Sequence, residues 1–265
     1  MAETLAEPHD PADRGALRVA VRGVSFGYAR NGKGRELVLD HVDLEIRQGD
    51  FLAILGPNGG GKTTLLKVIL GLLQPWSGEV AYQAPARRGR LGYVPQFSTF
   101  DKSFPLRIAD MVLMGRLGRR SLLLPYSRED RRAAAAALER LGLAHLAGTH
   151  VRETSGGQLQ RALIARALVS EPEVLFLDEP TAAIDAESRE ALRSVLEDLA
   201  RRIPIVVVTH DVGSISPLVN RIACINRRLV YHGPELSQET LEEAYGSPVE
   251  LVTHGVPHRV LHGHS

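Results

Sequence analysis

The sequence has little cysteine and no excess of either charge, and both scarcities exclude classes of protein. Cys224 is the only cysteine among the 265 residues, so the chain has no intrachain disulfide and no thiolate zinc cluster. The 32 basic and 31 acidic side chains balance, so no overall field attracts nucleic acid or an anionic membrane surface. We therefore expect a protein of a reducing compartment that has no nucleic-acid partner.

Long apolar runs are missing as well. No run approaches the roughly 18 residues that a membrane span needs. The acidic start, MAETLAEPHD, lacks the charged and apolar regions of a signal peptide. Hydrophobic residues still make up 44% of the chain and charged residues 24%, which is the profile of a globular domain with a full core. These features predict a cytoplasmic protein with one large domain.

Two kinds of apolar pattern predict a mixed α/β fold. Apolar residues alternate with polar or small ones over 17–21 and 42–46, which is typical of half-exposed antiparallel strands. The runs at 51–55, 174–177 and 205–208 are apolar without alternation, which suits strands of a parallel sheet buried on both faces. We expect a mostly parallel sheet with an N-terminal antiparallel β subdomain.

Helical spacing fills the segments between these strands. Helices are expected over 62–73, over 128–141 after an N-cap at Ser127, and around 192–199. Residues 97–165 show no strand pattern, so we expect an α-helical subdomain inserted between strands of the sheet.

The chain ends are expected to lie outside the folded domain. The predicted organisation is a flexible N-terminal tail at 1–15, one folded domain at 16–240 and a histidine-rich tail at 241–265. The tail holds four of the ten histidines, which are His254, His258, His262 and His264. Two interpretations stay open, because these imidazoles could bind Zn²⁺ weakly or belong to a solvated segment.

The strongest motif is a glycine-rich loop at residues 56–64. It follows the apolar run 51–55 and opens the helix expected at 62–73, which is the context of a phosphate-binding loop. In such a loop backbone N–H groups turn toward phosphate oxygens, Lys62 reaches the terminal phosphates and the Thr63 hydroxyl ligates Mg²⁺. The predicted nucleotide-binding residues here are Gly56, Pro57, Asn58, Gly59, Gly60, Gly61, Lys62, Thr63 and Thr64.

Four further side chains suit phosphoryl chemistry. Asp178 and Glu179 end a buried apolar run, at the edge where open parallel sheets bind their ligands. Asp178 suits the Mg²⁺ ligand shell, and Glu179 is placed to orient or deprotonate a water that attacks the terminal phosphate. His210 ends another run at the same edge, within reach of that phosphate. Gln96 lies where the sheet gives way to the helical insert, so its amide could contact both metal and attacking water.

A second glycine motif comprises Ser155, Gly156, Gly157 and Gln158, ahead of an apolar helix expected at 159–168. Its helix N-terminus can hold an anion, yet one nucleotide does not need two such sites. The motif is therefore expected to complete the site of a second copy of the chain, with two nucleotides held between two subunits across a twofold axis.

In this order, the motifs resemble the ATP-binding cassette (ABC) ATPases over residues 17–235. The family's segments correspond to the phosphate loop at 56–64, the Q-loop at Gln96, the signature at 155–158, the carboxylates at 178–179, the D-loop at 181–185 and the switch histidine at His210. The resemblance implies that ATP and Mg²⁺ are the cofactors, with Thr63, Gln96 and Asp178 around the metal. It also implies that Tyr28 stacks on adenine and that Asp185 adds to the nucleotide site.

The sequence departs from the usual family pattern at three positions. Thr154 replaces a leucine before the signature, and Gly60 and Thr63 replace commoner serines of the phosphate loop. Thr63 keeps the hydroxyl and Gly60 keeps the backbone donor, so hydrolysis is still expected.

A narrower resemblance concerns the start of the helical insert, from Tyr93-Val94-Pro95-Gln96 to Val112-Leu113-Met114-Gly115-Arg116. This run is similar to the ATPase subunits of bacterial zinc and manganese importers, as is the histidine-rich tail. In such transporters this surface docks a cytoplasmic helix of the membrane partner. The contact residues implied here are Phe97, Phe104, Leu106 and Met114, and ordinary core packing is the alternative for each.

The resemblance implies an ATP-hydrolysing subunit, peripheral on the cytoplasmic side of the membrane, that drives import of zinc or manganese. Its expected partners are a second copy of itself, a polytopic membrane permease and an extracytoplasmic metal-binding protein. The alternatives are the ATPase subunit of an importer for chelated iron or another solute, and a soluble ABC ATPase without a transport role.

Overall fold

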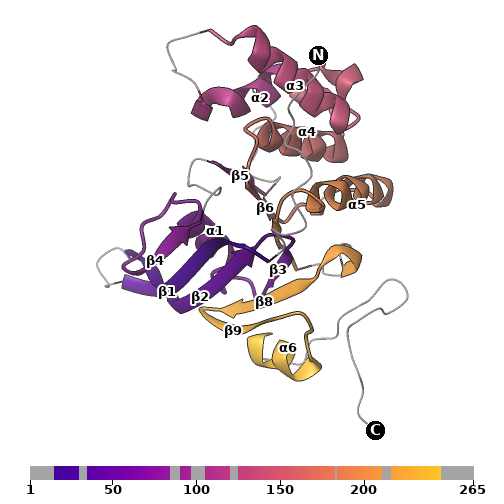
Figure 1. The fold of residues 1–265 in the computed structure, drawn as a ribbon. Coiled ribbons are helices and arrows are strands. Elements are labelled where there is room, and N and C mark those ends of the chain that lie inside the picture. The colour runs from indigo at the N-terminus through magenta and orange to yellow at the C-terminus, as the bar shows by residue number, and fades with distance from the viewer. Residues whose placement is uncertain are drawn as a thin grey trace.

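The computed structural model describes residues 15–29, 35–83, 90–96, 105–119, 125–182, 184–210 and 216–245 (Figure 1). Several predictions fall outside the described residues, namely those on the tail before residue 15, on Phe97, on Phe104, on Ala183 of the expected D-loop and on the histidine-rich segment after residue 245.

A three-stranded antiparallel sheet forms from the two alternating segments and one further strand. Its order is β2–β1–β4, with β1 at Leu17–Ala29, β2 at Arg35–Arg47 and β4 at Ser77–Tyr82. β1 and β2 pair antiparallel, with Val21 opposite Leu44. The predicted antiparallel β subdomain is therefore confirmed.

A second sheet has six strands in the order β5–β6–β7–β3–β8–β9. Its strands are β3 (Phe51–Leu55), β5 (Leu91–Val94), β6 (Val174–Asp178), β7 (Ile205–Val208), β8 (Arg221–Asn226) and β9 (Arg228–Gly233). All neighbours pair in parallel except β8 and β9, and every residue of β3, β6 and β7 is buried. The three unbroken apolar runs thus form the centre of a parallel sheet, as predicted.

Helix α1, Lys62–Ile69, lies between the two sheets and is shorter than the predicted 62–73. Gly71 takes a left-handed φ of 69°, and the Leu72 N–H donates to the Lys67 carbonyl at 2.8 Å, so a glycine turn closes the helix. The side chains of Leu65 and Leu66 pack in one core with residues of both sheets. α1 therefore fixes the antiparallel sheet to the parallel one.

The segment expected to be helical contains helices and, within its described residues, only an isolated bridge between Arg107 and His150. Its helices are α2 (Ile108–Leu113), η4 (Met114–Arg119), α3 (Arg128–Arg140), η5 (Ala144–Leu146), η6 (Val151–Glu153) and α4 (Gly156–Leu168). α3 begins as expected at the N-cap Ser127, whose hydroxyl accepts a hydrogen bond from the Asp130 N–H.

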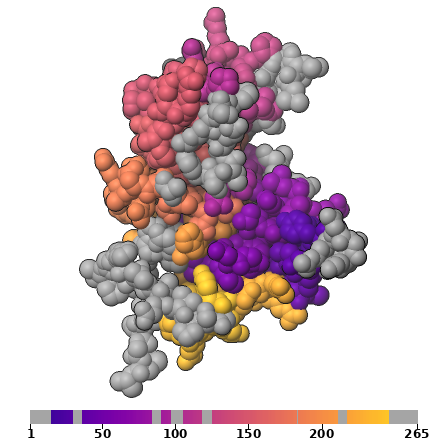
Figure 2. All heavy atoms as spheres, turned by 180° about the vertical axis from the view of Figure 1, so that it is seen from behind, coloured from indigo at the N-terminus to yellow at the C-terminus, as the bar shows by residue number. Residues whose placement is uncertain are grey.

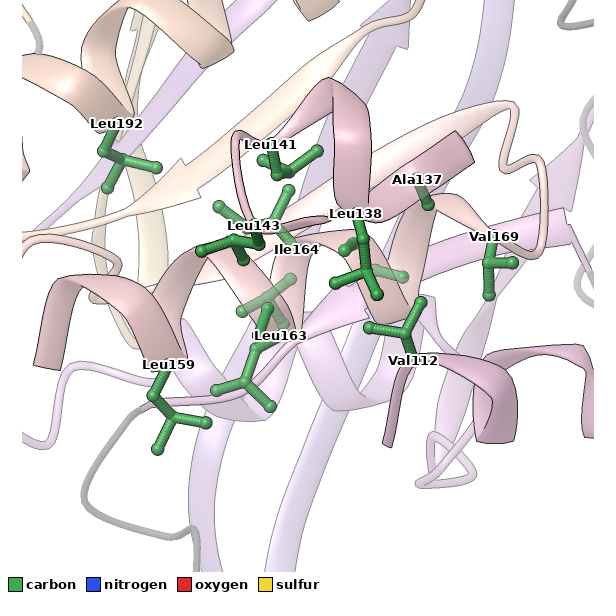
Figure 3. Packing of buried hydrophobic residues seen from close by; sticks show 14 of the residues in the cluster. Val112, Ala137, Leu138, Leu141, Leu143, Leu159, Leu163, Ile164, Val169 and Leu192 are labelled. Carbon is green, nitrogen blue, oxygen red and sulfur yellow. The ribbon is translucent and has the colours of Figure 1, made fainter. Parts of the chain in front are cut away.

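A continuous core joins these helices to the parallel sheet. Val112 of α2, Leu138 of α3 and Leu163 of α4 pack in the same cluster (Figure 3). That cluster also contains Leu175 and Val207 of the sheet. The helical part stands to one side of the two sheets in Figure 1, and α4 is its helix nearest the strands, with α2 and α3 beyond it.

The remaining helices are α5 (Ala186–Ala200), η7 (Ser216–Leu218) and α6 (Gln238–Tyr245). α5 buries Leu192, Leu196 and Leu199, which confirms the helical spacing of these residues. α6 continues past residue 240, where the folded domain was expected to end, because its Leu241 and Ala244 are buried.

His232 on β9 makes the stability of the fold depend on pH. Burial, with the nearby charge of Arg221, lowers the pKa of His232 from 6.5 to about 4, and its Nε2 is buried without a hydrogen-bond partner among the described residues. As the pH falls, His232 of the unfolded chain therefore binds a proton near pH 6.5, whereas His232 of the folded chain binds it only near pH 4. The contribution of neutral His232 to folding stability is therefore complete above pH 6.5 and is lost as the pH falls toward 4.

We expect the unfolding free energy of His232→Gln to fall less steeply than that of the wild type between about pH 7 and 4.5. The difference in slope is at most about 1.4 kcal/mol per pH unit, which corresponds to one proton. Denaturant titrations across this range measure it, and identical slopes for the two proteins would contradict the burial of a neutral imidazole.

Candidate functional site

The phosphate loop connects the buried strand β3 to the start of α1. Gly56, Gly59 and Gly61 have φ values of 145°, 79° and 98°, all in the region that favours glycine. Gly61 is the N-cap of α1, and without a side chain it leaves the N–H groups of the first turn without the usual cap. The loop and helix therefore present uncapped N–H groups and the positive end of a helix dipole, which together suit an anion.

The Lys62 side chain folds back onto the phosphate loop. Its Nζ donates to the carbonyl oxygens of Gly56 at 2.7 Å and Pro57 at 2.9 Å. Burial lowers the pKa of Lys62, and the negative charges of Glu179 and Asp178 oppose that shift. The ammonium is thus already desolvated and held by neutral carbonyls, which a phosphate can replace with stronger, charge-assisted hydrogen bonds.

The start of α1 is tied to the end of β6 by side chains. The Thr63 hydroxyl donates to Asp178 Oδ2 at 3.0 Å, and the Tyr93 hydroxyl lies 3.5 Å from the same oxygen. Asp178 is only 3% exposed, and burial raises its pKa. A threonine hydroxyl beside a buried carboxylate supplies the oxygen donors that Mg²⁺ prefers, so the residues present fit this ion.

Tyr93 is a member of the site that its sequence pattern did not mark. It lies on β5 opposite Phe176 of β6, one strand away from the carboxylates. Burial next to Asp178 raises the pKa of its hydroxyl to about 12. The hydroxyl therefore stays a proton donor to Asp178. Only the pairing of β5 with β6 would have identified Tyr93 as a site residue, and this pairing cannot be read from the sequence around Tyr93.

Glu179 and His210 meet at the carboxyl edge of the sheet, as the sequence predicts. Glu179 takes a left-handed φ of 50°, and its N–H donates to the Val208 carbonyl at 2.8 Å. His210 Nδ1 lies 2.9 Å from Glu179 Oε2. This contact lacks hydrogen-bond alignment, since Oε2 has no hydrogen-bond partner among the described residues. A strained backbone thus holds an acceptor oxygen that is buried and not saturated.

Gln96 and Tyr28 border the site from two other strands. Gln96 is exposed two residues beyond Val94, which pairs with Leu177, so it lies past the sheet edge as Glu179 does. Tyr28 is the next-to-last residue of β1, and its hydroxyl lies 3.4 Å from Thr64 Oγ1. Its ring contacts Phe26 in a T-shaped arrangement, and the residue is 44% exposed beside the phosphate loop.

The second glycine motif forms the first turn of α4, so the helix begins at Gly156 rather than at the expected residue 159. Ser155 Oγ accepts from the Gln158 N–H at 3.2 Å, and Gln158 Oε1 accepts from the Ser155 N–H at 3.0 Å. Thr154 is buried, and its hydroxyl donates to the Val151 carbonyl at 2.7 Å. The unusual threonine is therefore satisfied locally and leaves the cap intact.

Asp185 has a structural partner in this chain. Its carboxylate accepts from the Ser188 N–H at 2.8 Å and from the Ser188 hydroxyl at 2.9 Å, which caps α5. These bonds lower the pKa of Asp185. A Cβ on Gly157 would lie 2.2 Å from the Ser188 hydroxyl, so the predicted D-loop and the signature are in contact through Ser188. The structure gives Asp185 a capping role, and a nucleotide contact stays a prediction.

Comparison with known proteins identifies the family of these motifs. Residues 39–182 match the family described as ABC transporter. Over 214 residues the chain is 40% identical to a probable metal transport system ATP-binding protein of Chlamydia trachomatis, covering 80% of this chain and 89% of the relative. It is 38% identical to the zinc transport system ATP-binding protein TroB of Treponema pallidum, covering 80% and 82% of the two chains.

Solved structures share the fold. A chain of an inward-facing ABC transporter described as metal-chelate type superimposes with a TM-score of 0.77 at 31% identity, covering 88% of this chain and 90% of that one. A dimeric ATP-binding cassette in a post-hydrolysis state, bound to ADP and phosphate, gives a TM-score of 0.68 at 28% identity, covering 82% and 98%.

Proposed function

The chain belongs to the ABC transporter family, and on that premise we propose that it is the ATP-hydrolysing subunit of an importer for a divalent metal ion, zinc or manganese. The observation that carries the cargo is the set of relatives named for metal or zinc transport, which match 80% of the chain at 38% to 40% identity. The site geometry supports the ATPase part independently of these names.

The phosphate loop and the sheet edge are proposed to bind ATP together. Lys62 would leave the Gly56 and Pro57 carbonyls for the terminal phosphates, and residues 59–64 would supply backbone N–H groups. The exposure of Tyr28 and its position beside Thr64 support stacking on adenine. Thr63, Asp178 and Gln96 are proposed to hold Mg²⁺, which offsets phosphate charge when bound.

Glu179 is proposed as the base that prepares the attacking water. Its Oε2 is buried, has no hydrogen-bond partner among the described residues and lies next to His210. It can accept a proton from a water that attacks the terminal phosphorus, while the bond to the leaving ADP oxygen breaks. His210, whose side chain is 67% exposed, can turn toward the phosphate that is released.

A second copy of the chain is proposed to complete each site. Residues 155–158 cap α4 in the helical part, whereas the phosphate loop lies between β3 and α1. The dimeric relative with bound ADP and phosphate supports an arrangement in which each signature faces the other subunit's nucleotide. One nucleotide then contacts both chains, so ATP binding favours the closed dimer.

The membrane pathway is proposed to belong to a separate permease, with this subunit peripheral on its cytoplasmic side and an extracytoplasmic binding protein supplying the metal. Among the described helices none is long and apolar enough to cross a bilayer. Met114 is 44% exposed at the start of η4, which supports it as a permease contact, whereas Leu106 packs partly against the core.

One alternative cargo has an observation in its favour. The structural neighbour at 31% identity is described as metal-chelate type. An importer of chelated iron would use the same ATP chemistry with a different permease, so measurements of cargo separate the two.

We expect Glu179→Gln to bind ATP and keep the closed dimer while its turnover falls by about 10²-fold or more. The amide preserves the shape of the side chain but cannot accept a proton. A fall of this size is expected for the loss of a general base. Steady-state ATPase assays and size-exclusion chromatography with ATP measure the two properties. Glu139→Gln, at an exposed position on α3, is the matched control, and equal activity of the two variants would refute the role of Glu179.

Deleting the gene and starving the cells of metal is expected to lower cellular zinc or manganese selectively. Elemental analysis of zinc, manganese and iron measures this, with wild-type or Glu179→Gln protein restored. Rescue by the wild type alone is the predicted result, because import requires hydrolysis. A deficit in iron alone would favour the chelate importer, and unchanged metal contents would refute metal import.

A further inference from the structure

The end of the described chain lies against the base of the phosphate loop. α6 buries Leu241 and Ala244 in a small core with Ala53 and Leu55 of β3. Seen from behind, yellow residues of the C-terminal part lie against purple residues from the first part of the chain (Figure 2). Packing thus places α6 under the strand that delivers the loop.

Tyr245, at the end of α6, reaches the first residue of that loop. Its hydroxyl accepts a hydrogen bond from the Gly56 N–H at 3.3 Å. The carbonyl of the same residue accepts from Lys62 Nζ at 2.7 Å. Both backbone polar groups of Gly56 are therefore held by side chains, one from within the loop and one from a helix 189 positions away in sequence.

The backbone of Gly56 has little freedom to find another partner. Its φ is 145°, and a Cβ added there would lie 1.9 Å from the Ile225 carbonyl oxygen on β8. The turn between β8 and β9 also holds the loop, because the Arg227 N–H donates a hydrogen bond to the Gly60 carbonyl at 2.9 Å. An amide fixed this closely needs an acceptor in place, and losing it leaves a desolvated donor unpaired.

The two bonds to Gly56 differ in what ATP would do to them. Lys62 is the side chain proposed to move to the phosphates, which releases the Gly56 carbonyl. The Tyr245 hydroxyl has no such competing ligand, and burial raises its pKa, so it stays neutral. It can hold the Gly56 peptide both before and after ATP binds.

We propose that Tyr245 is a positioning residue for the phosphate loop, which makes α6 part of the support of the ATP site. The inference rests on the proposed function only in taking residues 56–64 as the ATP phosphate site. Tyr245 touches no reacting atom, and it acts by fixing the peptide at which β3 turns into the loop.

Tyr245→Phe tests the proposal, because it removes the hydroxyl and keeps the ring. Tyr231→Phe is the matched control, since the Tyr231 hydroxyl accepts a hydrogen bond from the Glu235 N–H at the same distance of 3.3 Å, away from the phosphate loop. We expect the KM and Kd for ATP to rise about three- to tenfold in Tyr245→Phe, because a loop that is no longer fixed in the free protein must be ordered when ATP binds. We expect kcat to stay within about twofold and Tm to match that of Tyr231→Phe.

Hydrogen exchange of the peptide that contains Gly56 supplies a second measurement, and Tyr245→Phe should accelerate it relative to the control. Equal KM and equal exchange in the two variants would overturn the role of Tyr245. A fall in Tm with unchanged KM would overturn it too, because it would show a purely structural bond. If wild-type protein failed to bind ATP at all, the proposed function would fail instead, which separates the two results.

Discussion

The hydrogen bond from Thr63 to Asp178 joins the two halves of the site, and the rest of the arrangement depends on it. It links the first turn of α1, which carries the phosphate loop, to the end of β6, which carries the carboxylates. It forms because β3 and β6 flank β7 in one parallel sheet, so their carboxyl ends share an edge. The buried apolar runs of these strands therefore position the chemistry as well as the core.

The phosphate loop is held in shape by partners outside the glycines themselves. Lys62 bonds two of its carbonyls, Arg227 donates to Gly60, and Tyr245 accepts from Gly56. A loop held in this way loses less conformational entropy when phosphate binds than a free glycine loop would. The same logic applies to the signature, where Ser155 and Gln158 cap each other before any nucleotide arrives.

Sequence alone predicts the parts of this structure that have a local cause. The buried strands, the Ser127 cap and the phosphate loop follow from apolar runs, capping chemistry and glycine spacing within a few residues. The sequence pattern misplaces the end of α1, at Ile69 ahead of the Gly71 turn, and the start of α4 at Gly156, because glycine can either join a helix or end it. The sequence pattern misses Tyr93 and Tyr245 because their partners lie 85 and 189 positions away, and only strand pairing and the packing of α6 bring them together.

In the proposed dimer, two copies of this chain hold ATP between the phosphate loop of one and the signature of the other. The most direct measurement is a structure of Glu179→Gln protein with Mg²⁺ and ATP. We expect a twofold dimer with two ATP molecules, each contacting Lys62 of one subunit and Ser155 of the other. ATP bound to Lys62 with residues 155–158 of both copies facing solvent would contradict it.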